Sequence, residues 1–314
     1  MLLVTGATGF VGRALCAKAI AQGRSLRRVV RKTLDEREDC SIRVVSNIDE
    51  SVDWSEALHG VTHIVHLASR VHLLDDHALE PLKEYRKVNV QGTVNLARQA
   101  AKSGVKRFVF VSSVKVNGES TKLGCPFTAD DTPAPEDPYG VSKYEAEQEL
   151  LHLATHVDME IVIVRPPLVY GPDVRANFER MIHWLSKGVP LPFGAVTNNR
   201  RSLIALDNLV DILIRCVDHP SAAGKIFMAS DGEDLSTTEL LQRLGSAMGS
   251  PVLLIPLPAS MLNILASLLG KEKVASRLLG SLQVDISETR RLLDWSPVIG
   301  VDEALRQTVI GRVA

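Results

Sequence analysis

The sequence has few of the features that mark secreted, metal-binding or nucleic-acid-binding proteins. Its cysteines form no CxxC pair and have no histidine at the spacing of metal ligands; they are Cys16, Cys40, Cys125 and Cys216. We therefore expect free thiols in a reducing compartment and no metal site. The chain also begins on a strand-like segment without the charged and apolar regions of a signal peptide, so we expect a cytoplasmic protein. The net charge of −1 gives no long-range attraction to nucleic acid.

Internal repeats, low-complexity tracts and long helical apolar runs are missing as well. The segment 251–270 carries no formal charge. Pro256 and Pro258 interrupt it, and the helical part that remains, about 259–269, is too short to span a bilayer. We expect no transmembrane segment and interpret this stretch as a core or dimer-facing helix, with a contact to a membrane surface or a partner as the alternative.

The residues that are present have the composition of a globular protein, 45% hydrophobic and 23% charged over 314 positions, and their pattern predicts an α/β fold. The expected strands are 2–5, 26–30, 42–45, 62–66, 108–111 and 161–164, and the expected helices are 10–21, 81–102 and 138–155. Continuous β-branched strands separated by helices are typical of parallel strands covered on both faces. The pattern therefore predicts a Rossmann-type doubly wound parallel sheet.

The pattern changes after Arg165, where prolines become frequent and helices dominate. We expect a dinucleotide-binding Rossmann domain over 1–165 and a smaller, mainly helical C-terminal substrate-binding lobe over 166–314. The apolar run at 226–229 is typical of a buried strand, and we expect it to return to the main sheet.

Three glycines follow the first strand at G-x-x-G-x-x-G spacing: Gly6, Gly9 and Gly12. A pyrophosphate needs close approach of the backbone, and the helix that begins next offers free N–H groups and a favourable dipole. A tight turn without a ligand is the alternative, but the position between the first strand and the first helix favours dinucleotide binding. The other residues of this loop expected to contact the cofactor are Thr8, Phe10 and Val11.

The end of the second strand bears on which dinucleotide binds. An NAD site has an acid there for the ribose hydroxyls, whereas an NADP site has a cation for the 2′-phosphate. Here Arg31 occupies that position within a run of Arg27, Arg28, Arg31 and Lys32, and no acid occurs before Asp35. We therefore predict NADP, with NAD or a simple solvated basic loop as the alternatives.

An acid–base centre is indicated by Tyr139 and Lys143, which share one face of the helix that begins near Pro138. A phenol has an unperturbed pKa of about 10, and a nearby ammonium is expected to lower it. Ser113 follows the strand 108–111 and can donate a hydrogen bond to the same substrate oxygen. The order of glycine loop, strand-end serine and Tyr-x-x-x-Lys predicts an enzyme that moves a hydride and a proton.

The chain resembles the extended short-chain dehydrogenase/reductases of the NAD-dependent epimerase/dehydratase group over nearly its whole length. The matching stretches are 5–12 (TGATGFVG), 66–69 (HLAS), 88–96 (VNVQGTVNL), 111–118 (VSSVKVNG), 139–143 (YGVSK), 165–172 (RPPLVYGP) and 201–209 (RSLIALDNL). The resemblance implies that Asn89 anchors the active-site backbone beside the cofactor and that Asn177 and Arg201 face the substrate's diphosphate or uridine. It also implies cofactor contacts at Asn47, Ile48, Leu67 and Ala68, and a homodimer formed through 81–102 and 138–155, whose apolar side chains could equally pack on their own sheet.

Departures from the family pattern narrow the reaction. Dehydratases of this group carry Asp-Glu after the active-site Ser or Thr, and Val114 and Lys115 stand there instead, so 4,6-dehydration is disfavoured. Asn117 and Leu168 replace a usual tyrosine and asparagine near the expected sugar, which suggests a substrate other than plain UDP-glucose. Lys115 is either a solvated loop lysine or a contact to the C4–C6 edge of the sugar.

Three functions remain open for these residues. Because Arg31 favours an NADPH pool, we first expect reduction of the 4-ketone of a UDP-4-keto-6-deoxy-N-acetylhexosamine in surface-polysaccharide (lipopolysaccharide) synthesis. The first alternative is a UDP-hexose or UDP-HexNAc 4-epimerase, in which a bound NAD suffices. The second is a non-catalytic dinucleotide-sensing protein, although such proteins commonly lose the Tyr or the Lys that this chain keeps.

Overall fold

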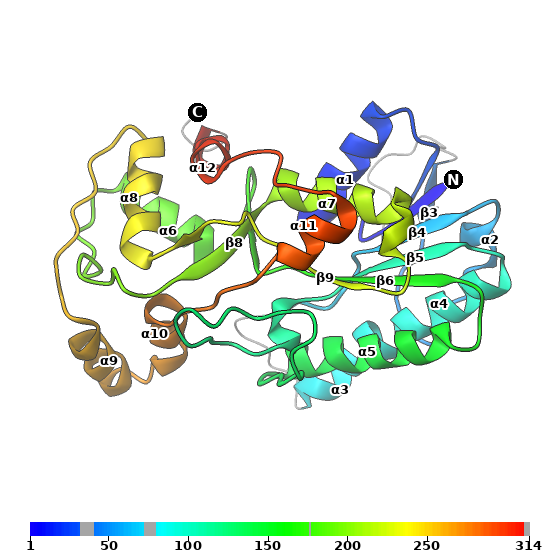
Figure 1. Cartoon of the computed structure of the whole chain (residues 1–314), viewed down its shortest axis with the longest axis horizontal. Coiled ribbons are helices and arrows are strands. Elements are labelled where there is room, and N and C mark those ends of the chain that lie inside the picture. The colour runs from blue at the N-terminus through cyan, green and yellow to red at the C-terminus, as the bar shows by residue number, and fades with distance from the viewer. Residues whose placement is uncertain (32–40, 72–79, 176, 311–314) are drawn as a thin grey trace.

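The computed structural model describes residues 1–31, 41–71, 80–175 and 177–310, and a seven-stranded sheet forms the larger part of the molecule (Figure 1). The strand order is β3-β2-β1-β4-β5-β6-β9, and all neighbouring strands run parallel. The strands are β1 (Leu2–Thr5), β2 (Leu26–Val30), β3 (Ile42–Val44), β4 (His63–His66), β5 (Arg107–Val111), β6 (Glu160–Arg165) and β9 (Ile226–Met228). The strands β2 and β3 follow β1 on one side of it, and β4, β5 and β6 follow on its other side. This arrangement confirms the predicted Rossmann-type doubly wound sheet.

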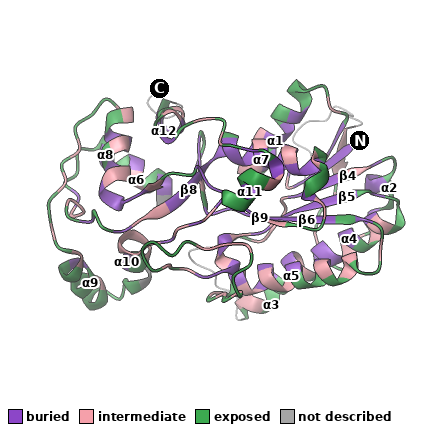
Figure 2. Cartoon of the chain, viewed as in Figure 1, coloured by how far each residue is buried: buried purple, intermediate pink, exposed green. Residues whose placement is uncertain are grey.

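Helices cover both faces of the sheet (Figure 1). On one face α1 (Phe10–Ala21) packs against α7 (Leu206–Asp218). On the other face α4 (Thr93–Lys102) packs against α5 (Pro138–Ala154). Because the sheet lies between two helical layers, its strands are buried on both sides, as Figure 2 shows.

Successive side chains of each strand point in turn into two different buried cores, which explains the continuous apolar runs of the sequence. In β1, Leu2 and Val4 belong to the core under α1 and α7, whereas Leu3 belongs to the core under α4 and α5. Successive side chains of a strand point to opposite faces, so both kinds of position must be apolar when both faces are covered.

A second, three-stranded sheet builds the smaller part of the molecule. Its strands are β7 (Leu168–Tyr170), β8 (Arg201–Ala205) and β10 (Asp234–Leu235); β8 runs parallel to β7 and antiparallel to β10. The helices α6 (Asn177–Ser186), α8 (Thr237–Ala247) and α12 (Val301–Ile310) contribute to the core beside it. The remaining helices are α2 (Ser55–Leu58), α3 (Pro81–Tyr85), α9 (Ala259–Leu268), α10 (Glu272–Leu279) and α11 (Ser287–Leu293).

Helix α9 exposes most of its aliphatic side chains. Met261, Ile264, Leu265 and Leu268 are exposed, and Leu262 is the residue of α9 that is buried. The expectation of a core helix here is therefore wrong, and a contact of this helix with a second copy of the chain, a membrane surface or a partner stays a prediction. Among the described residues we find no helix, α9 included, whose length and apolar character would let it cross a bilayer.

Two elements from the second half of the chain lie on the main sheet. β9 pairs with β6 at the sheet edge, and α7 packs on α1 and contacts β4 and β5. We expected only the strand to return; α7 accompanies it because most of its residues, such as Ile212 and Leu213, are apolar and buried. The division into domains at residue 165 stays a prediction.

The helix expected over 81–102 consists of three pieces. Between α3 and α4 the segment Arg86–Gly92 is π-helical. A Cβ atom at Gly92 would lie only 2.7 Å from Cγ2 of Ile48, so the widened turn packs closely against the segment after β3. A π-helical turn holds more residues than an α-helical one, and such turns occur often at functional sites.

The apolar side chains of this helical stretch are used within the chain. Tyr85, Val94 and Leu96 are buried, and Leu96 belongs to the core under α4 and α5. Leu96 therefore packs on its own sheet, and Tyr85 and Val94 are buried within the chain. The homodimer stays a prediction.

A buried ion pair joins α5 to the main sheet. Arg165, at the end of β6, donates from Nε to Glu147 Oε1 at 3.0 Å and from Nη2 to Oε2 at 2.5 Å, and both side chains are almost fully buried. The guanidinium also donates from Nη1 to Oδ1 of Asn117 at 3.1 Å. Removing one member of such a pair leaves a buried charge without compensation.

We expect Glu147→Gln to lower the free energy of unfolding by about 3 kcal/mol, because Arg165 then loses its counter-charge in a dry environment. Chemical denaturation measures the change. Glu145→Gln is the matched control: it lies on the same helix and pairs with the exposed Arg86, so its effect should be much smaller. Equal effects of the two substitutions would contradict the role given to the buried pair.

Candidate functional site

The glycine loop has a backbone that only glycine can form. Gly6 has φ +65°, and a Cβ atom there would lie 2.9 Å from the backbone nitrogen of Ala68. A Cβ at Gly12 would lie 2.1 Å from the carbonyl oxygen of Gly6. Gly9 precedes α1 as its N-cap and makes no side-chain cap, so the first N–H groups of the helix point into the loop without a side-chain acceptor there. This cradle fits the pyrophosphate of a dinucleotide.

The remaining residues expected to contact the cofactor lie at the carboxyl ends of β2, β3 and β4, beside the glycine loop. They are Arg31 after β2, Asn47 and Ile48 after β3, and Leu67 and Ala68 after β4. In doubly wound sheets this edge is where dinucleotides bind. Arg31 and Asn47 are exposed and Ile48 is half-buried.

A buried histidine that the sequence analysis did not single out ties this edge together. His66 Nδ1 lies 2.7 Å from Thr5 Oγ1, and its Nε2 lies 3.0 Å from Thr93 Oγ1. The backbone N–H of Ala68 donates to the same Thr5 oxygen at 3.2 Å. Burial and the nearby Lys143 lower the pKa of His66 to about 3, so the ring is neutral. Only its place at the start of the HLAS stretch marked it in the sequence.

Asn89 is a positioning residue in the π-helical turn. Its Oδ1 accepts from Ser69 Oγ at 3.0 Å and from the backbone N–H of Arg70 at 2.8 Å. Its Nδ2 donates to the carbonyl of Arg70 and to Ser142 Oγ, both at 3.0 Å. The amide therefore joins the loop after β4 to helix α5, and its polar atoms are engaged by the chain itself.

Helix α5 carries Tyr139 in its first turn and Lys143 one turn later. Asp137 caps the helix by accepting at Oδ1 from the N–H of Gly140 at 2.7 Å. A Cβ at Gly140 would lie 2.8 Å from the carbonyl oxygen of Lys115, so this glycine lets the first turn approach the segment that follows β5.

Ser113 and Lys143 meet at the carboxyl end of β5. Lys143 Nζ donates to the carbonyl of Val111 at 2.9 Å, and it lies 4.5 Å from the ring centroid of Phe110 and 5.9 Å from that of Tyr139. Ser113 Oγ accepts from the N–H of Lys115 at 3.2 Å and caps the 3-10 turn Val114–Val116. The serine can still donate its own hydroxyl proton.

The electrostatics of the pair differ from the expectation. Burial, and secondly the carboxylate of Asp137, raise the pKa of Tyr139, while a hydrogen bond with Ser69 opposes this. Burial lowers the pKa of Lys143 to about 7, with Glu147 acting in the opposite direction. The prediction that Lys143 lowers the pKa of Tyr139 is wrong for the protein alone, because the ammonium is itself destabilised by burial and is bonded to Val111.

Lys115 is held by two carboxylates. Its Nζ lies 2.8 Å from Glu119 Oε1 and also pairs with Asp137 Oδ2. The interpretation as a solvated loop lysine is therefore wrong, since the fold brings Glu119 and the cap of α5 to it from two sides. A contact from Lys115 to the sugar stays a prediction.

The polar atoms of Asn117 are used within the chain. It is buried, accepts from Arg165, and donates from Nδ2 to the carbonyl of Thr128 at 2.8 Å. The buried guanidinium of Arg165 uses its side-chain oxygen; that Asn117 lies near the sugar stays a prediction. Leu168, the other departure from the family pattern, is exposed.

Arg201 is joined by a second arginine that the sequence analysis missed. Arg201 donates from Nη1 to the carbonyl of Gly280 at 3.2 Å. Burial and the positive charge of Arg277 lower the pKa of Arg201, and Glu119 acts against them. Arg277 lies on α10, far along the chain, and no local pattern connects it with Arg201; two neighbouring guanidinium groups suit an anion such as a diphosphate.

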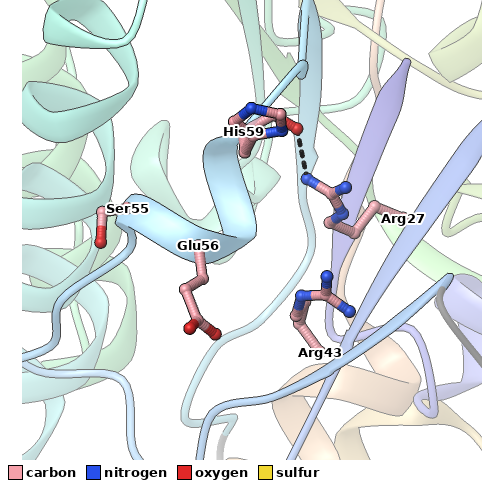
Figure 3. A pocket seen from close by; sticks show the side chains of 5 residues that line it. All are labelled: Arg27, Arg43, Ser55, Glu56 and His59. Atoms are coloured by element: carbon pink, nitrogen blue, oxygen red, sulfur yellow. Dashed lines mark hydrogen bonds between the residues drawn. The ribbon is translucent and has the colours of Figure 1, made fainter. Parts of the chain in front are cut away.

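A cavity of about 460 Å³ lies elsewhere, lined by Arg27, Arg43, Ser55, Glu56 and His59 (Figure 3). Arg27 begins the run that suggested NADP, yet it donates to the carbonyls of Ala57 at 2.9 Å and His59 at 2.6 Å. This arginine therefore attaches α2 to β2 and does not face the cofactor edge.

Some expectations fall outside the described residues: those for Lys32, Asp35, Cys40 and the side chain of Asn177, of which only the backbone position at the start of α6 is described. Cys16, Cys125 and Cys216 are free thiols. Within the described ranges, no cluster of three or more His, Cys, Asp or Glu side chains could hold a metal ion.

Comparisons with known proteins agree with this geometry. Residues 2–229 match the sequence model of the NAD dependent epimerase/dehydratase family. The chain is 46% identical to a Vibrio cholerae protein described as UDP-glucose 4-epimerase, over 98% of this chain and 94% of that protein. It is 29% identical to an Escherichia coli O157:H7 protein described as N-acetyl-alpha-D-glucosaminyl-diphospho-ditrans,octacis-undecaprenol 4-epimerase, over 88% of this chain and 82% of that protein.

Among solved structures, UDP-glucuronic acid 4-epimerase of Bacillus cereus in complex with NAD superposes with a TM-score of 0.78. The match covers 99% of this chain and 97% of that one, at 20% sequence identity. This similarity shows that the two proteins share a fold.

Because the pKa of Lys143 is low, the free energy of unfolding should depend on pH. Between about 7 and 10.5 the unfolded chain holds a proton on this lysine and the folded chain does not. Raising the pH across this window therefore favours the folded state. The unfolding free energy of the cofactor-free wild type, minus that of Lys143→Met, should rise with pH over this range in denaturation series.

Lys102→Met, which removes an exposed lysine at the end of α4, is the control and should give a difference that does not change with pH. A flat difference for Lys143→Met as well would mean that Lys143 keeps an ordinary pKa.

Proposed function

The chain belongs to the NAD dependent epimerase/dehydratase family, and from this premise we propose that it is a C4 epimerase of a UDP-sugar. The observation that carries the proposal is its near-full-length similarity to the Vibrio cholerae UDP-glucose 4-epimerase. Because the polar atoms of Asn117 are used within the chain, this departure from the family pattern bears less on UDP-glucose as the substrate. The exposed Leu168 is the other difference at the expected sugar site.

The cofactor supplies hydride acceptance and hydride return when it is bound. The chain supplies the proton transfer: Tyr139 takes the proton of the sugar's 4-hydroxyl and returns it after the 4-keto sugar has turned over. Ser113 donates a hydrogen bond to the same sugar oxygen, since its Oγ is already oriented by the N–H of Lys115. Lys143 Nζ lies 5.9 Å from the centroid of the Tyr139 ring, where its protonated form stabilises the phenolate. Positioned proton transfer of this kind contributes about 10²–10⁴-fold in rate.

The substrate's diphosphate is assigned to Arg201, Arg277 and Asn177. Arg277 lies 4.0 Å from Glu119, and its positive charge lowers the pKa of Arg201 while Glu119 raises it. A diphosphate could accept hydrogen bonds from both guanidinium groups. The names of the two similar proteins differ in the group that the sugar diphosphate carries. It is a nucleoside in the Vibrio cholerae protein and a polyprenol in the Escherichia coli protein.

Reduction of a UDP-4-keto sugar is the second candidate, and Arg31 is the residue that favours it. It stands at the end of β2, where an NAD site would have an acid. An epimerase recycles its hydride and gains nothing from NADPH, whereas a reductase consumes reduced cofactor at each turnover.

Tyr139→Phe should lower turnover by at least about a hundredfold while cofactor affinity stays nearly unchanged, because only the proton-transferring oxygen is lost. Steady-state epimerisation of UDP-glucose and calorimetric titration with NAD measure the two quantities. Wild-type turnover in this variant would remove Tyr139 from the mechanism.

Incubation with UDP-glucose or UDP-GlcNAc, and separately with NADPH and a UDP-4-keto-6-deoxy-HexNAc, distinguishes the reactions. Interconversion of C4 epimers without loss of nicotinamide absorbance is the expected result. Oxidation of NADPH by the keto sugar alone would replace the epimerase by the reductase. Inertness toward every nucleotide sugar would favour a dinucleotide-sensing protein.

A further inference from the structure

Lys115 contacts both sides of the acid–base centre. Its backbone N–H donates to Ser113 Oγ at 3.2 Å, and its carbonyl oxygen lies 2.8 Å from the position that a Cβ atom at Gly140 would take. Its ammonium pairs with Asp137 Oδ2. Asp137 and Gly140 stand on either side of Tyr139 in the sequence. One residue therefore joins the serine to the turn of α5 that carries the tyrosine.

The carboxylate of Asp137 gives one oxygen to each of two partners. Oδ1 accepts from the N–H of Gly140 at 2.7 Å and caps α5, and Oδ2 accepts from the ammonium of Lys115. The side chain of Asp137 is 16% exposed and that of Lys115 is 23% exposed, so solvent screens this pair less than a surface pair. Because Lys115 holds the second oxygen, the carboxylate keeps the orientation in which the first oxygen caps the helix.

Glu119 holds the same ammonium from another side. Its Oε1 lies 2.8 Å from Nζ of Lys115, and its Oε2 lies 4.0 Å from Nη2 of Arg277 on α10. Lys83 on α3 shows the contrast, since it pairs with Glu80 where the two side chains are 78% and 70% exposed. Such a surface pair fixes little. Two carboxylates from different segments give the end of Lys115 a defined position.

We propose that Lys115 is a positioning residue for the proton transfer, and that it holds the first turn of α5, with Tyr139, at a fixed distance from Ser113. This inference rests on the proposed C4 epimerase function, in which both hydroxyl groups must reach one oxygen of the sugar. A displacement of about 1 Å can lower a rate about a hundredfold. The role needs no contact between Lys115 and the sugar.

The charge of Lys115 also acts on the tyrosine. Burial is the largest cause of the raised pKa of Tyr139, and the carboxylate of Asp137 is the next. The ammonium places the opposite charge beside that carboxylate, so its loss should raise the pKa of Tyr139 further. The other titratable groups at the phenol or its neighbouring ring are Lys143 on α5, Tyr85 on α3 and, after β4, Arg70.

Lys115→Met tests the role in the NAD-loaded full-length protein, with UDP-glucose and UDP-GlcNAc as substrates. kcat should fall about tenfold while KM stays within about twofold, because the proton-transferring groups are displaced and the substrate contacts are kept. Lys115→Arg keeps the charge and should restore kcat to within about threefold of the wild type. Lys122→Met, which removes an exposed lysine of the same segment, is the matched control and should change neither quantity.

Asp137→Asn completes a double-mutant cycle, since an amide oxygen can still cap α5 while the partner charge of Lys115 is gone. Both substitutions remove one interaction, so kcat of Lys115→Met/Asp137→Asn should lie within about twofold of that of the slower single variant. Losses that multiply in the double variant would mean that the two residues act independently, and would overturn the inference.

The pKa of Tyr139 gives a measurement that does not depend on turnover. The phenolate absorbance of each NAD-loaded variant, minus that of the same variant with Tyr139→Phe, should show a pKa higher by about half a unit or more in Lys115→Met than in the wild type. An unchanged pKa would overturn the inference. A raised KM with unchanged kcat would overturn it too, because Lys115 would then bind the sugar itself. A wild type that epimerises neither UDP-sugar would overturn the proposed function, and the titration alone would then decide whether Lys115 acts on Tyr139.

Discussion

Helix α5 is held in place by charges that it buries. Glu147 pairs with Arg165 at the end of β6, and Lys143, one turn earlier, donates to the carbonyl of Val111 at the end of β5. The helix is thus attached to two neighbouring strands of the sheet at the edge where parallel strands end. Because the geometry of both contacts is specific, the first turn with Tyr139 has little freedom to move relative to Ser113. The candidate site depends on this attachment.

The same burial determines the acidity of the site. It raises the pKa of Tyr139 and lowers that of Lys143, so the protein alone disfavours the phenolate that a base requires. Positive charge brought to the glycine-loop edge of the sheet lowers the pKa of Tyr139 again, because it stabilises the phenolate. In the proposed function Tyr139 therefore becomes an effective base only when the cofactor site is filled, and membership of an NAD dependent family agrees with this.

Local patterns in the sequence were sufficient for much of this. Gly9 and Gly12 are required by contacts with Gly6 inside the loop and Gly6 by its positive φ, and Tyr139 and Lys143 share a face by helical spacing alone. The parallel sheet followed from apolar runs buried on both sides. Contacts over long sequence distances could not be predicted: Asn117 accepts from Arg165, Lys115 meets Asp137, and Arg277 lies near Arg201 only because the fold brings β8 and α10 together. The exposure of α9 was likewise invisible, since an uncharged apolar segment is usually buried.

The most direct test of the account is the titration of Tyr139 with and without the cofactor. The phenolate absorbance of wild type minus Tyr139→Phe gives the pKa of this one residue. We predict a raised pKa in the cofactor-free protein and a fall of about one unit or more when NAD is bound, since the added positive charge favours the phenolate. An unchanged pKa on saturation with NAD would contradict it.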